Sequence, residues 1–111
     1  ARQANLGQEV QMLKHQVELY RVQHLDKVPD LVSSWDPLVK PSDIQGNVHN
    51  PAGQTYGPYL PTAPTNPLTN SNVVATSAAP TVGWVYNAQT GEVHGVDASG
   101  NKTDDGVTVL P

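Results

Sequence analysis

The sequence has no cysteine and no phenylalanine among its 111 residues. Without cysteine it can form no disulfide, no thiolate metal site and no cysteine nucleophile. It has only two tryptophans and four tyrosines, so the core must come mainly from Val, Leu, Ala and Met. This length suits one domain, which we place at residues 1–111. Its margin of stability is small, because a small core must offset a large loss of chain entropy.

Basic residues are scarce after position 40. Residues 1–40 carry five Lys or Arg and five Asp or Glu, whereas residues 41–111 carry Lys102 alone against five acidic residues, which gives the net charge of −4. No basic patch is available to neutralise phosphates, so we expect no nucleic-acid partner. No apolar run approaches the roughly 20 residues that span a bilayer.

Motifs of known catalytic sites are missing as well. The sequence contains no G-x-S-x-G, no P-loop and no G-x-G-x-x-G. The histidines at 15, 24, 49 and 94 include no pair at the i, i+4 spacing of a helical metal site. We therefore expect no enzyme activity.

Residues 1–28 are predicted to form one long α-helix that ends before Pro29, because the residue before a proline avoids the α region. A mostly apolar stripe recurs at alternating spacings of four and three, which places it on one helix face. It comprises Leu6, Val10, Leu13, Val17, Tyr20 and His24. We expect Leu6, Val10, Leu13 and Val17 to pack in the core or in a filament, and His24 to be the partly exposed end of the stripe.

Two further features of this helix point to assembly. Met12, Leu19 and Val22 form a second, shorter stripe, which could meet either the core or the same helix of another copy. No Ser, Thr or Asp precedes the periodic residues as an N-cap, so we expect the helix to continue into sequence upstream of Ala1.

Residues 29–82 hold nine of the ten prolines, a density that central strands do not accept. We expect a short helix within residues 30–40 and a long extended loop over 41–82. Residues 83–111 follow as a β-hairpin and a C-terminal strand. Trp84-Val85-Tyr86 and residues 92–96 are the predicted hairpin strands, and 107–110 is the predicted final strand. Trp84 and Tyr86 share one face and should anchor the hairpin to the core.

Together these elements predict an α+β domain, with a long N-terminal helix packed on a small antiparallel sheet. An acidic loop follows the hairpin and offers oxygen side chains that could wrap Ca²⁺. Its candidate ligands are Asp97, Ser99, Asn101, Asp104 and Asp105. The match to an EF-hand loop is poor, because Lys102 stands at the sixth position and Thr108 at the twelfth. A solvated turn accounts for the same residue types.

Several segments resemble type IV pilin-like proteins, most closely the major pseudopilin of type II secretion systems. They are Ala4-Asn5-Leu6, Val17-Glu18-Leu19-Tyr20, Gln23-His24, Pro29, Gly57-Pro58-Tyr59-Leu60, Asn66-Pro67-Leu68-Thr69-Asn70 and Gly83-Trp84-Val85-Tyr86-Asn87 with Thr90-Gly91. The resemblance spans residues 1–96. It implies a pilin-like fold and a hydrophobic N-terminal helix, cleaved by a prepilin peptidase and often methylated, that lies upstream of these residues.

The resemblance also implies partners and a location. It implies a helical filament of identical subunits that works with other pseudopilins and the secretion machinery. The subunit would be anchored in the inner membrane before assembly, with this domain on the periplasmic or extracellular face. Many major pseudopilins bind calcium in a C-terminal acidic loop, but residues 97–105 lack their longer Gly-Asp-rich stretch.

Two functions follow as hypotheses. The first is a structural subunit of a secretion pseudopilus or related pilus-like filament, acting by polymerisation in protein export or surface display. The alternative is a secreted monomeric binding module whose Pro- and Tyr-rich loop 51–67 contacts a carbohydrate or a protein.

Overall fold

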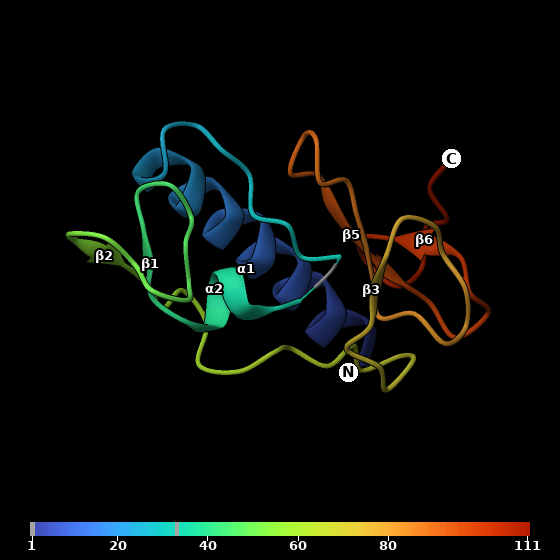
Figure 1. Ribbon diagram of the computed structural model, residues 1–111. Coiled ribbons are helices and arrows are strands. Elements are labelled where there is room, and N and C mark those ends of the chain that lie inside the picture. The colour runs from blue at the N-terminus through green and yellow to red at the C-terminus, as the bar shows by residue number, and fades with distance from the viewer. Residues whose placement is uncertain (1, 33) are drawn as a thin grey trace.

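The computed structural model describes residues 2–32 and 34–111 (Figure 1). It has an α+β architecture, with one N-terminal helix and two small sheets at opposite ends of that helix (Figure 1). Its elements are α1 (Arg2–Gln23), α2 (Asp36–Val39), β1 (Ser42–Asp43), β2 (Thr55–Tyr56), β3 (Val74–Ala75), β4 (Trp84–Tyr86), β5 (Val93–Val96) and β6 (Lys102–Thr103). The predicted α+β class is therefore confirmed in its coarse form.

The larger sheet has the strand order β3-β4-β5-β6. The predicted hairpin is present, since β4 and β5 pair antiparallel with Tyr86 opposite Val93. The sheet is mixed, however, because β3 runs parallel to β4, with Val74 opposite Trp84. Strand β3 and the small β1–β2 ladder both lie in the stretch predicted to be loop. Proline spacing did not reveal them, because each contributes only two paired residues.

The C-terminal strand lies earlier than predicted. Strand β6 is formed by Lys102 and Thr103 and pairs antiparallel with β5. Residues 107–110 are not a strand. They fold back on β6 through one bridge, Thr103 opposite Val109, and a hydrogen bond from the Leu110 amide to the Lys102 carbonyl (2.8 Å). This short return covers the outer edge of β6.

Helix α1 ends at Gln23, five residues before the predicted end, and the predicted first residue, Ala1, lies outside the described residues. Leu25 and Asp26 adopt left-handed backbone conformations, with φ of 59° and 63°. The Asp26 amide donates to the Arg21 carbonyl at 2.9 Å and closes the last turn. The turn sends the following segment back along the helix, where the Pro29 carbonyl accepts a hydrogen bond from the Tyr86 hydroxyl (2.7 Å).

Buried Asn66, in the stretch predicted to be a loop (residues 41–82), binds that stretch to the larger sheet by hydrogen bonds. Its side-chain amide donates to the carbonyls of Gly83 (2.7 Å) and Val96 (2.8 Å). Its side-chain oxygen accepts from the amides of Leu68 (2.7 Å) and Thr69 (3.3 Å). Asn66 is fully buried, so these bonds satisfy groups that water cannot reach.

Candidate functional site

The inner stripe of α1 lies entirely in the core. Leu6, Val10 and Leu13 are 0% exposed and Val17 is 1% exposed. Hairpin residues Trp84 and Tyr86, at 0% and 1%, belong to the same cluster. The Trp84 indole N–H donates to the Pro64 carbonyl at 3.0 Å, so its polar atom is also satisfied. These six residues therefore hold the helix to the sheet and do not face another subunit.

The second stripe of α1 lies on the outside. Met12, Leu19 and Val22 are 37%, 39% and 80% exposed. The question that the sequence left open, whether this stripe meets the core, is thus answered: it does not pack in the core of this chain. It is an apolar surface on the face of α1 that points away from the sheet.

His24 is the point where the sequence prediction is wrong. It was expected to be partly exposed, yet it is 0% exposed. Its Nδ1–H donates to the Tyr20 carbonyl (2.8 Å), and its Nε2 accepts from the Ser42 hydroxyl (2.7 Å). Its ring stacks on that of Tyr20, with centroids 3.7 Å apart. Because both nitrogens are paired, the imidazole is buried without an orphaned polar atom.

The loop after Ser42 is organised by the Asp43 carboxylate. This side chain accepts from the backbone amides of Ala52, Asn47 and Gln45 at 2.9–3.0 Å and from the Asn47 side chain at 3.0 Å. The hydrogen bonds from Ala52 and Asn47 stabilise the ionised form and lower the pKa of Asp43 to about 2. The loop is therefore held by a charge that does not face solvent.

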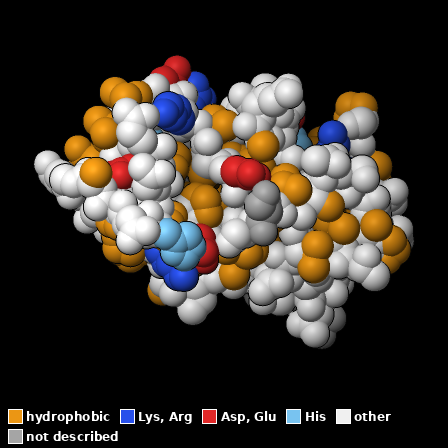
Figure 2. Space-filling view, viewed as in Figure 1, with side chains coloured by type: hydrophobic (Ala, Val, Ile, Leu, Met, Phe, Trp, Pro, Cys, Tyr) orange, Lys and Arg blue, Asp and Glu red, His pale blue; other side chains and the backbone are white. Residues whose placement is uncertain are grey.

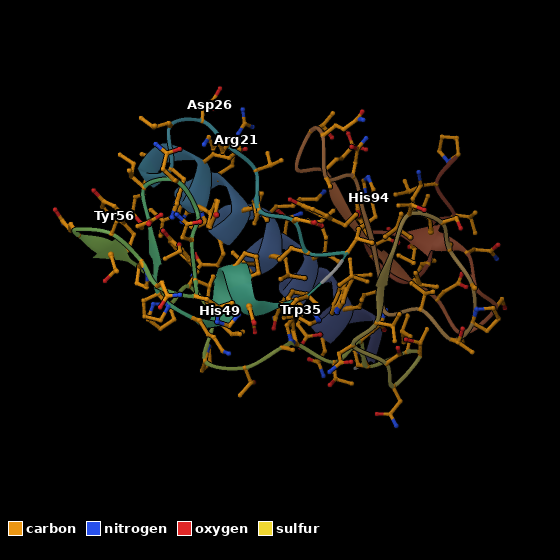
Figure 3. All side chains as sticks on the ribbon, viewed as in Figure 1. Arg21, Asp26, Trp35, His49, Tyr56 and His94 are labelled. Atoms are coloured by element: carbon orange, nitrogen blue, oxygen red, sulfur yellow. The ribbon has the colours of Figure 1, made fainter. Side chains whose placement is uncertain are left out.

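The Pro- and Tyr-rich loop 51–67 turns its aromatic side chains inward. Tyr59 is 7% exposed, and its hydroxyl donates to Gln23 Oε1 at 2.6 Å. Burial is the main reason that the pKa of Tyr59 is raised to about 12. Tyr56, labelled in Figure 3, is half-buried. Its ring lies edge-on to that of His24, with centroids 5.6 Å apart. The exposed residues of this loop include the prolines at 51, 58 and 61 and the polar side chains of Gln54, Thr55, Thr62 and Thr65, but neither tyrosine.

The candidate calcium residues are divided between two turns. In the first, Asp97 Oδ1 accepts from the backbone amides of Ser99 and Asn101, both at 2.9 Å. In the second, Asp105 Oδ1 accepts from the amides of Thr108 (2.7 Å) and Val107 (2.8 Å). These bonds, with that of Thr108 first, lower the pKa of Asp105 to about 2.

The fifth candidate, Asp104, faces α1, where one oxygen accepts from Lys14 Nζ at 3.1 Å. Within residues 2–32 and 34–111, no group of three or more His, Asp or Glu is arranged to hold a metal ion. Calcium binding stays a prediction. Asp97 and Asp105 accept hydrogen bonds from backbone amides of their own turns, and Asp104 binds Lys14 on α1.

A cluster around His94 was not predicted. Its Nδ1 lies 2.7 Å from Asp104 Oδ1 and its Nε2 lies 3.0 Å from Glu92 Oε2 (Figure 3). Only the doubly protonated imidazolium donates to both carboxylates. The hydrogen bond from His94 is the main reason that the pKa of Glu92 is lowered. The i, i+2 spacing of Glu92 and His94 on a strand was a readable signal, but the approach of Asp104 was not.

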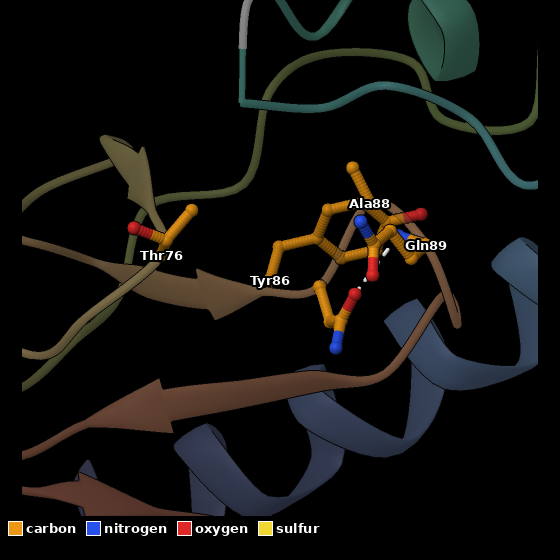
Figure 4. Close-up of a pocket in the computed structure, with 5 residues that line it drawn as sticks. Thr76, Tyr86, Ala88 and Gln89 are labelled. Atoms are coloured by element: carbon orange, nitrogen blue, oxygen red, sulfur yellow. Dashed lines mark hydrogen bonds between the residues drawn. The ribbon is translucent and has the colours of Figure 1, made fainter.

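The surface hollows are shallow. One of about 340 Å³ is lined by Thr76, Tyr86, Asn87, Ala88 and Gln89 (Figure 4). The Asn87 side-chain oxygen already accepts from the Gln89 amide at 2.8 Å, and the Tyr86 hydroxyl is bound to Pro29. Figure 2 shows Lys, Arg, Asp and Glu side chains scattered over one face of the molecule, whereas the five residues that line this hollow include none of these types. The Tyr86 hydroxyl and the Asn87 side-chain oxygen are therefore already hydrogen-bonded within the fold.

A second hollow, of similar size, lies between α2 and the loop at 46–49. Its polar lining includes Asp30, Ser34, Asp36 and His49, of which His49 is labelled in Figure 3. Asp36 pairs with Lys40 at 3.6 Å, and its backbone amide donates to the Ser34 hydroxyl oxygen at 3.0 Å. Asp36 and Ser34 are therefore already engaged in contacts within the fold.

No helix in the described part of the chain has the length and apolar character to cross a bilayer. In comparisons with known proteins, no family model matches the chain, and neither a curated protein nor a solved structure matches it.

Proposed function

We propose that this chain is the globular part of a structural subunit of a type II secretion pseudopilus or a related type IV pilus-like filament. It would act by polymerisation in protein export or surface display, with other pseudopilins and the secretion machinery as partners. In this proposal a hydrophobic helix outside these 111 residues anchors the subunit in the inner membrane before assembly. The domain described here would then lie on the periplasmic or extracellular face.

The observation that carries the proposal is the contact between segments that resemble pseudopilins. The Tyr59 hydroxyl reaches Gln23 on α1 at 2.6 Å. The Asn66 amide reaches the Gly83 carbonyl, just before β4, at 2.7 Å. The Tyr86 hydroxyl reaches the Pro29 carbonyl. Residues scattered over 64 positions thus form one set of tertiary contacts. This is expected if the resemblance reflects a shared fold, and it is unexpected if the pieces match separately by chance.

The shape of the domain suits a filament subunit. Helix α1 has 22 residues, which at 1.5 Å per residue is about 33 Å, and the longest extent of the molecule is 44 Å. The inner stripe packs the helix into the hydrophobic core along most of this length. A rod held in this way can pass a displacement from one end of the domain to the other as a unit. That property serves a filament that pushes cargo.

The test is assembly by the full-length product of the encoding gene. We expect the gene to encode about 20 apolar residues just upstream of Ala1, and we expect the processed product, produced with its assembly machinery, to form filaments that electron microscopy detects. The control is the same gene with a charged residue in the centre of the apolar segment, which should leave the subunit unassembled. A gene without that segment, or a full-length product that stays monomeric, would refute the proposal.

A further inference from the structure

We draw no further inference here: the strongest candidate, the cluster of Glu92, His94 and Asp104 beside Lys14, where β5 and the turn after β6 meet α1, belongs to the site already described, and its charged groups are paired with one another, so that nothing in the described part of the chain points to a ligand or a partner there.

Discussion

Replacing Asn66 by Asp changes one buried NH₂ group to an oxygen and leaves the shape of the side chain nearly unchanged. In the wild type, this NH₂ group donates to the carbonyls of Gly83 and Val96 at 2.7 and 2.8 Å. In Asn66→Asp, a negatively charged oxygen faces these two carbonyl oxygens at hydrogen-bond distance. Two hydrogen bonds are lost, and two buried acceptors remain unpaired.

The expected cost follows from these contacts. Each lost hydrogen bond contributes about 1 kcal/mol, and each buried unpaired carbonyl costs about 1–3 kcal/mol. Some overlap between these terms and relaxation of the loop bring the expected loss to about 3–5 kcal/mol of the free energy of unfolding. Domains of this size have about 5–15 kcal/mol in total, so the variant should be marginal. Asn72→Asp is the matched control, since it adds the same charge at an exposed position nearby and should cost less than about 0.5 kcal/mol.

Urea unfolding followed by tryptophan fluorescence is a suitable assay, because Trp84 is fully buried. The experiment should be repeated between pH 7 and pH 4.5. Burial beside two carbonyls raises the pKa of the introduced carboxyl above its unfolded value, so its penalty is full at pH 7. The difference from wild type should shrink as the pH falls and the carboxyl becomes a donor. A loss below about 1 kcal/mol at pH 7, or a difference that does not shrink, would show that Asn66 does not hold the loop in this way.

Other changes test the charged groups. Glu9→Gln should raise the free energy of unfolding at pH 7 by about 0.5–1 kcal/mol in urea titrations. The reason is that Glu9 Oε2 is buried without a partner and that burial raises the pKa of Glu9. Equal stability of the two proteins would argue against a cost of burying the Glu9 carboxylate. Asp43→Asn should flatten the acid limb of the stability profile, since the Asp43 contribution is present above about pH 4 and is lost as the pH falls through the folded-state pKa of about 2; an unchanged limb would contradict the assignment. If Asp97 and Asp105 ligate calcium, about 5 mM Ca²⁺ should stabilise the chain by about 1–2 kcal/mol over Mg²⁺ in a thermal melt, and no shift would remove the calcium prediction.

The features that the sequence predicted correctly are governed by contacts close along the chain. The inner stripe of α1 follows from spacings of three and four residues, which one helix face dictates whatever covers it. The β4–β5 hairpin follows from an Asn-to-Gly turn between two short apolar runs, and the Asn87 side-chain oxygen caps that turn by accepting from the amides of Gln89 and Thr90. Such signals can be read because the partners lie within a few residues.

The features that the sequence did not predict depend on distant partners. Strand β3 has only two paired residues, and it pairs because Trp84 and Val85 lie beside it. The outer stripe of α1 differs from the inner one only in which side the sheet occupies, so periodicity could not decide between core and surface. The approach of Asp104 to His94 depends on how the turn after β6 is folded, which no spacing rule gives.

His24 shows why residue type is a poor guide to burial at the end of a helix. His24, at the end of an apolar stripe, is predicted to be partly exposed, and burying an unpaired imidazole would be costly. The helix itself provides a partner for one ring nitrogen, because the Tyr20 carbonyl, four residues earlier, accepts a hydrogen bond from Nδ1–H. The partner of the other ring nitrogen is the Ser42 hydroxyl, which reaches it only because the chain turns back at Leu25 and Asp26. The early end of α1 and the burial of His24 therefore depend on the same turn. A helix that continued to residue 28 would carry the chain away from His24.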